Sequence, residues 1–167
     1  MAKIEELLNS IKAVLDNVDG ITGSGRVRLF PQRTITQEDF EATFQVHLND
    51  KRPINAWIIR WDGASNTRVG ATLNSYWRDY SVTVIGFISF NNESDLNLMN
   101  IAENILDTFG PKMTLGLTDV PVPGAPTLFE SSIVLTEFDH GMLGPVLCST
   151  ATFKITAKEW KGIVTFT

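Results

Sequence analysis

Apolar residues near the start of the chain recur at spacings of three and four, the pattern of one helix face. Glu5, Lys12 and Asp16 fall between them and face outward. Gly20 follows the last turn and marks the expected end of the helix. The sequence therefore predicts an amphipathic helix that needs a partner surface. Its apolar stripe comprises Ile4, Leu7, Leu8, Ile11, Val14, Leu15 and Val18.

A second helix is predicted after the polar turn "NNES". Ser94 is the expected N-cap, and Asp95 lies where the helix dipole favours an acid. Gly110 and Pro111 mark its end. The apolar positions that follow the helical period are Leu96, Leu98, Met99, Ile101, Ala102, Ile105, Leu106 and Phe109.

Alternating apolar residues predict strands over 54–61, 80–90, 128–138 and 146–160, and a short extended segment over 26–30. In the last strand, Thr and Lys side chains alternate with apolar ones, so this strand has one buried and one wet face. The apolar face comprises Leu147, Ala151, Phe153, Ile155 and Ala157.

The segment "TITQEDFEATFQVHL" fits two structures. Thr36 and Asp39 resemble a capping box, and Phe40 and Phe44 fit a helix face. Alternation from Phe40 to Leu48 fits a strand nearly as well, and we favour a strand at the end of this segment.

Together these elements predict an α+β fold in a single domain, residues 1–167. We expect a mainly antiparallel β-sheet with two amphipathic helices packed on one face. Polar, Gly- and Pro-containing stretches predict flexible loops near 20–25, 62–75 and 118–127.

The strand 80–90 is apolar on both faces, which two helices on one side cannot explain. Val82 and Val84 point one way, and Ile85 and Phe87 the other. Two explanations stay open for the second face: a loop or the Phe40 segment folds over it, or a neighbouring subunit covers it.

Composition favours a globular protein of ordinary kind: 167 residues, 43% hydrophobic and 20% charged. The net charge of −5 makes the whole surface a poor attractor of nucleic-acid phosphate. Cys148 is the only cysteine, so no internal disulfide can form. Acidic residues follow Met1 closely, and we expect neither signal peptide nor membrane helix but a protein made in the cytoplasm.

Candidate chemistry is sparse. "EFDHG" places Glu137, Asp139 and His140 together, and these could bind a metal or act as an acid–base pair. A polar hairpin turn explains them more simply. "GITGSG" leads into an extended segment rather than a capped helix, so it lacks the terminus that holds a phosphate. We predict no catalytic, cofactor-binding or metal-binding residue, and an inert, half-buried thiol at Cys148.

Aromatic residues gather in the central segments. Trp57 and Phe90 are expected in the core, because they follow the strand period. Trp77 stands among polar residues at a strand entry, where an interface role is plausible. Candidate interface residues with another subunit or partner are Arg60, Arg68, Tyr76, Trp77, Arg78, Ile85, Phe87, Val120 and Val122.

The order of elements resembles a known family. The strand "INAWIIRW", the stretch "IGFISFNNESD", a helix finishing "ILDTF" and the strand "VLCSTATFKITAKEW" follow the N-terminal helix. This arrangement, over residues 4–160, resembles the tail terminator (tail completion) proteins of long-tailed bacteriophages. "VPVPGAP" and "GIVTFT" have no counterpart in that pattern.

The resemblance implies a structural protein of the virion tail and not an enzyme. Such proteins form a ring, usually a hexamer, on the tail tube. The ring stops tail polymerisation and offers a docking surface to the head connector. Partners would be identical subunits, the tail tube protein and the connector, while DNA passes the ring without specific binding. Alternatives are a tail tube or head–tail joining protein, or a small ligand- or metal-binding enzyme domain that uses "EFDHG".

Overall fold

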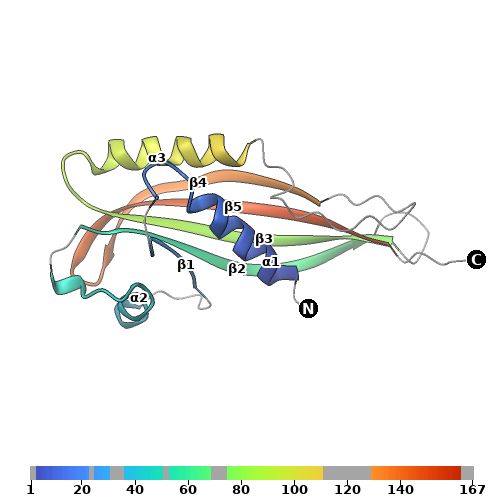
Figure 1. Ribbon diagram of the computed structural model, residues 1–167, viewed down its shortest axis with the longest axis horizontal. Helices are drawn as coiled ribbons and strands as arrows, with labels where there is room; N and C mark the ends of the chain where they lie inside the picture. Colours follow the sequence, from blue (N-terminus) through green and yellow to red (C-terminus); the bar gives the residue numbers. More distant parts are fainter. Residues whose placement is uncertain are drawn as a thin grey trace, which may run out of the picture.

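The structure is a computed structural model that describes residues 3–22, 25–30, 36–50, 53–68, 75–110 and 129–162. Three helices and five strands lie in these ranges (Figure 1). The helices are α1 (Lys3–Leu15), α2 (Gln37–Phe44) and α3 (Ser94–Phe109), and Leu48–Asp50 form a 3₁₀ turn, η1. The strands are β1 (Val27–Leu29), β2 (Asn55–Arg68), β3 (Ser75–Ser89), β4 (Phe129–Leu143) and β5 (Val146–Gly162).

All five strands form one sheet in the order β1-β2-β3-β5-β4. β1 pairs with β2 in parallel, and the other neighbours are antiparallel. The predicted α+β fold with a mainly antiparallel sheet is confirmed. Register shifts at Asp62 and Thr136 mark bulges in β2 and β4.

The main core lies between one sheet face and the helices α1 and α3. Leu7, Ile11 and Leu15 of α1 are buried with Leu98 and Ile105 of α3, as their helical spacing predicts. The sheet contributes Trp57, Val84 and the predicted apolar face of β5 from Ala151 to Ala157. The two predicted helices therefore cover the same face.

Of the described elements, α2 and η1 cover one end of the second sheet face (Figure 1). Phe40 of α2 is buried there and meets Phe87 edge-on, with ring centroids 6.0 Å apart. Of the two explanations for the apolar second face, folding over of the Phe40 segment accounts for Phe87. Ile85, two residues before Phe87 on the same face of β3, is half-buried.

The expected strand at the end of the Phe40 segment is wrong, because residues 37–44 form a helix and Leu48–Asp50 form a 3₁₀ turn. Thr36 is its N-cap and accepts a hydrogen bond from the Asp39 backbone N–H at 3.2 Å. Gln45 ends the helix with a left-handed backbone (φ 55°). Local capping and the contact of Phe40 with the sheet therefore outweigh the β-like alternation.

Several predicted boundaries also differ. α1 ends at Leu15, and turns carry the chain on to Gly20. The N-cap of α3 is Glu93, whereas Ser94 is buried as its first residue. The cross-strand ladder continues through Asp62–Arg68, predicted as loop, so this stretch is strand.

The β4–β5 hairpin is also longer than predicted. β4 extends to Leu143, so Asp139 and His140 lie within a strand and not in the hairpin turn. The turn itself is Gly144–Pro145, where Gly144 has a positive φ of 57°. This extension places "EFDHG" on the surface of the sheet.

Candidate interaction surface

Strand β4 forms one edge of the sheet and is long and exposed. Among the described residues only β5 pairs with it, so within this part of the chain its outer backbone groups face away from the sheet. The strand has 15 residues, and every described side chain from Val134 to His140 is exposed. A long, exposed edge strand is the usual site at which another chain adds to a sheet.

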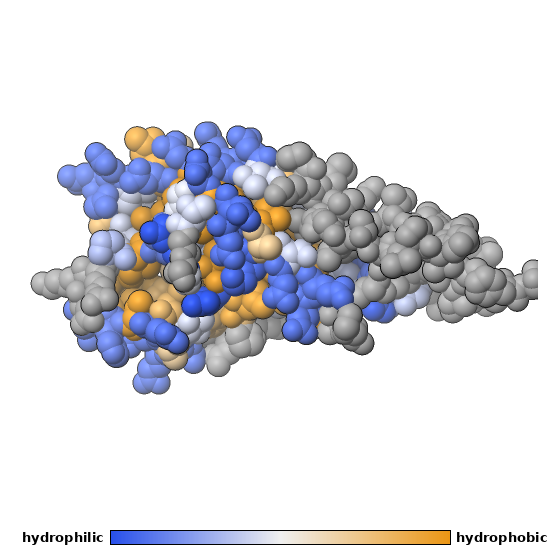
Figure 2. Space-filling view, viewed as in Figure 1, coloured by the Kyte–Doolittle hydropathy of each residue, from blue (hydrophilic) through white to orange (hydrophobic). Residues whose placement is uncertain are grey.

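Apolar side chains gather beside this edge. Leu135, Phe138 and Met142 pair with Phe153, Ala151 and Leu147 of β5, whose side chains share the face that carries α1 and α3. Exposed apolar residues of the first turns of α3 lie at the same end, visible at the top of Figure 2. We call this set the hairpin–α3 strip. It comprises Phe90, Leu96, Met99, Leu135, Phe138, Met142 and Leu147.

The strip contains most of the large exposed apolar side chains of the described residues. Nine such side chains are exposed, and only Trp61 and Val134 lie outside the strip. Met142 is the most exposed, at 64%. Single exposed apolar residues are ordinary, but a group of them on neighbouring elements beside a strand edge is typical of a protein–protein contact.

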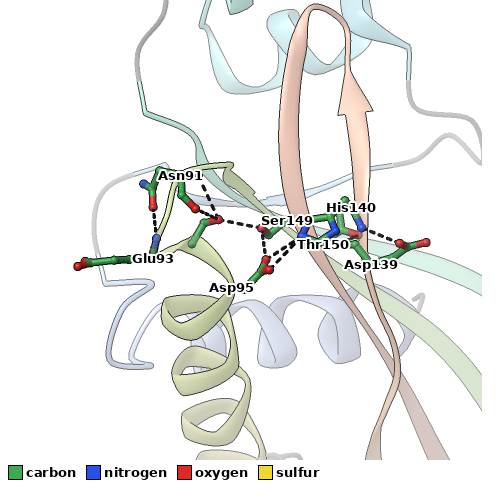
Figure 3. A network of polar contacts seen from close by, with 8 residues as sticks. Asn91, Glu93, Asp95, Asp139, His140, Ser149 and Thr150 are labelled. Atoms are coloured by element: carbon green, nitrogen blue, oxygen red, sulfur yellow. Dashed lines mark hydrogen bonds and ion pairs between the residues drawn. The ribbon is translucent and has the colours of Figure 1, made fainter.

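A polar network joins the hairpin to the start of α3 (Figure 3). His140 of β4 lies 2.9 and 3.1 Å from the two carboxylate oxygens of Asp95. Ser149 of β5 donates a hydrogen bond to Asp95 Oδ1 at 2.6 Å. The hydroxyl of Ser149 is also 3.0 Å from that of the buried Ser94. Three elements therefore meet at one carboxylate.

The electrostatics favour the ionised form of this carboxylate. The hydrogen bond from Ser149, and then the one from His140, lower the pKa of Asp95 below its usual value of 3.8. Phe90 packs edge-on against the His140 ring, with centroids 5.3 Å apart. The network thus holds the hairpin against α3 and fixes the strip that surrounds it.

The geometry is not that of a catalytic triad. Asp95 lies between Ser149 and His140, whereas in a triad the histidine lies between the serine and the acid. Glu137 pairs in register with Thr152 and is exposed, on the opposite sheet face from His140. Within the described residues, no three His, Cys, Asp or Glu side chains group closely enough to hold a metal ion.

The predicted aromatic and arginine cluster lies elsewhere, where β2 and β3 extend beyond the helices (Figure 1). We call residues 61–68 and 75–80 the arm. Arg78 donates to Asn66 Oδ1 at 3.1 Å and to the Tyr76 hydroxyl at 3.3 Å. Arg60, at the base of the arm, donates to Asp62 at 3.1 Å. Trp77 is half-buried, so these side chains already have contacts within the chain.

Other predicted site residues are scattered. Phe87 belongs to the cluster under α2, and Ile85 lies next to it on the same face. The Arg68 backbone pairs with Tyr76, but its side chain lies outside the described part. Val120 and Val122 also lie outside the described residues. Their interface role stays a prediction.

Two individual expectations were wrong. Phe90 was expected in the core and is 48% exposed, whereas Trp57 is fully buried as expected. Cys148 was expected to be half-buried and is fully buried, and this burial raises the pKa of its thiol to about 11.

Sequence reasoning missed the hairpin–α3 strip because it did not place β4 at the sheet edge. One signal was available: Val134 and Leu135 are adjacent apolar residues in a strand, so they cannot both face the same core. The predicted strand ends at residue 138, before Met142, so the prediction leaves out the place of Met142 on the strand face.

No protein-family model matches the sequence, and no curated protein matches it. Among solved structures, the chain is similar to the core region of PilO from the type IV pilus system of Pseudomonas aeruginosa, at 11% sequence identity. The match covers 65% of this chain and 83% of that chain, with a TM-score of 0.20. A TM-score this low carries no argument about fold or function.

No helix of the described residues is long and apolar enough to cross a membrane.

Proposed function

We propose that this chain is a structural protein of a bacteriophage tail, in which identical copies form a ring that caps the tail tube. The ring, a hexamer by resemblance to tail terminator proteins, would end tube polymerisation and offer a docking surface to the head connector. Its place would be the virion tail, after assembly in the host cytoplasm, and its role would be assembly and not catalysis.

The observation that carries the proposal is the open edge of β4 beside the hairpin–α3 strip. An edge strand offers unpaired backbone groups, and the strip offers apolar area next to them. A single contact of this kind, repeated between different surfaces of identical copies, generates a ring when the rotation closes.

The charge of the chain fits a conduit for DNA. At a net charge of −5, the protein repels phosphate groups overall, so DNA would pass such a ring without being held. The resemblance of the sequence supports a tail terminator, and the surface geometry supports assembly with other chains.

Sedimentation velocity of the full chain over a range of concentrations tests the proposal. We expect a ring-sized species that grows with concentration, or that forms on purified tail tubes observed by electron microscopy. Met142→Asp places a charge in the strip and should shift the association to at least about tenfold higher concentration. Trp61→Asp alters a similarly exposed apolar residue outside the strip and should assemble as the unaltered chain does.

Two outcomes would overturn the proposal. One is a monomer at every concentration that also fails to bind tail tubes. The other is an assembly that Met142→Asp leaves unchanged while Trp61→Asp disrupts it, because the arm and not the strip would then form the contact.

A further inference from the structure

A cavity opens between α2, η1 and the start of β2, on the sheet face opposite α1 and α3. Its volume is about 290 Å³, enough for one aromatic or branched aliphatic group. Apolar side chains line most of it, and apolar surface is visible around α2 in Figure 2. They are Phe40, Phe44, Val46, Leu48, Ile54 and Ala56.

The walls of the cavity are held in place by hydrogen bonds. Glu41 accepts a hydrogen bond from the Leu48 backbone N–H at 2.9 Å, which ties η1 to α2. Asn55, on the other side, donates to Gly20 O at 2.8 Å and accepts from the Trp57 indole at 2.9 Å. A cavity with fixed walls needs little ordering when a ligand enters.

Positive charge borders the cavity. Arg26 lines it directly. Gly25 also lines it, and the Arg28 guanidinium lies against this glycine, 3.0 Å from where a Cβ would stand. Within the described residues, no carboxylate lies at ion-pair distance from Arg26 or Arg28. In a chain of net charge −5, two adjacent half-buried guanidinium groups without an acidic partner favour an external anion.

We propose that this cavity binds a small organic carboxylate, with its aromatic or branched aliphatic group inside and its carboxylate beside Arg26 and Arg28. Apolar burial provides the affinity, and the guanidinium groups select the charge of the ligand. This site is separate from the hairpin–α3 strip, and the proposal does not depend on ring formation.

Displacement of the fluorescent probe anilinonaphthalenesulfonate from the full chain tests the site, with phenylacetate and its neutral amide, phenylacetamide, as competitors. The two competitors have nearly the same shape and differ in charge. We expect phenylacetate to displace the probe at about tenfold lower concentration than the amide. Arg26→Gln, and separately Arg28→Gln, should reduce this preference, whereas Arg78→Gln in the arm should leave it unchanged.

Val46→Trp fills the cavity without altering its charge, and should weaken both competitors. Thermal unfolding of each variant checks that it is folded. Equal displacement by phenylacetate and phenylacetamide would overturn the proposal. A preference that survives both arginine substitutions, or that Arg78→Gln removes equally, would do the same.

Discussion

Gly86 lies in the middle of β3, directly against the ring of the buried Trp57. A Cβ at this position would stand 2.4 to 2.7 Å from three ring carbons of Trp57, closer than real Cβ atoms approach. The indole is held on its other side by its hydrogen bond to Asn55 at 2.9 Å. The glycine therefore serves close packing and not a turn.

Gly86→Ala is accordingly expected to lower the free energy of unfolding by about 2 kcal/mol, through overpacking of the core. Urea denaturation followed by tryptophan fluorescence measures the change. Gly141→Ala is the matched control, because a Cβ there would meet only Thr150 Cγ2, at 3.9 Å. Equal stability of the two variants would contradict the packing role of Gly86.

Cys148 lies in the second, smaller core, between α2 and the sheet, so its reactivity measures how well this core is closed. Its side chain is fully buried among Phe30, Phe40 and Ile58, and burial raises the pKa of the thiol from 9.0 to about 11. This shift alone reduces the thiolate fraction at pH 8 about a hundredfold, and burial blocks access in addition.

We therefore expect a thiol-disulfide reagent to modify the folded chain at pH 8 at least about a hundredfold more slowly than the chain in urea. Phe40→Ala opens the same core and should speed the reaction. Leu98→Ala, in the core on the other face, is the control and should change it less. Rapid modification of the folded wild-type chain would show that α2 does not seal this end of the sheet.

At the scale of elements, the junction of α3 with the β4–β5 hairpin depends on the ionised carboxylate of Asp95. Ser149 and His140 lower the pKa of this group in the folded state, so its contribution to stability is fully present above the unfolded value near 3.8. It is lost as the pH falls through the lower, folded pKa. Because solvent screens the interactions of this exposed carboxylate, we predict the direction of the pH effect on stability and not its size.

Asp95→Asn keeps the shape of the side chain and removes its charge. We expect this variant to have a lower urea midpoint than the wild type at neutral pH, with a difference that shrinks below pH 3.8. Glu103→Gln changes the net charge equally on an exposed turn of α3 and should not show this pH dependence. A difference that stays constant down to pH 2 would argue against a role for the ionised carboxylate.

Elements with a single strong period could be predicted from the sequence. The stripe of α1, the stripe of α3 and the alternation of β5 each fit one geometry, and packing on one sheet face followed from them. The Phe40 segment fitted both periods, since Phe40 and Phe44 satisfy a helix and an alternation alike. Its helix is stabilised by the contact with Phe87, which lies 47 positions after Phe40 in the sequence and is close to it only in the fold.

The interaction surface could not be predicted for a related reason. Alternation shows that residues 128–138 favour a strand, but the order of strands in the sheet determines whether that strand is central or at the edge. The same apolar residues, Phe138 and Met142, would be core in a central strand and are surface in an edge strand. The cavity likewise exists only when α2 lies beside Pro53 and Ile54. The sequence pattern of the α2 segment did not decide between a helix and a strand, so the cavity could not be predicted.

At the scale of the whole molecule, the two sheet faces have different roles. One is covered by α1 and α3, and within the described residues the other is covered at the α2 end. The rest of the second face carries Thr152 and Thr156, which are half-buried, and Lys154, which is exposed. The surface most suited to contact with another chain is therefore the β4 edge with the hairpin–α3 strip beside it, and not the polar part of the second face.

Salt dependence distinguishes this edge from the arm as the contact between copies. Copies that each carry a net charge of −5 repel one another, while contact through the hairpin–α3 strip is mainly apolar. Raising the salt concentration screens the repulsion, since the Debye length falls from about 10 Å at 0.1 M to about 3 Å at 1 M. Self-association measured by sedimentation should therefore strengthen severalfold over this range.

Contact through Arg60 and Arg78 with acids of a neighbour would instead weaken as the salt concentration rises, because salt screens attraction between exposed charges. Arg78→Gln provides the control: it should leave the salt response unchanged if the strip is the contact, and abolish the weakening if the arm is.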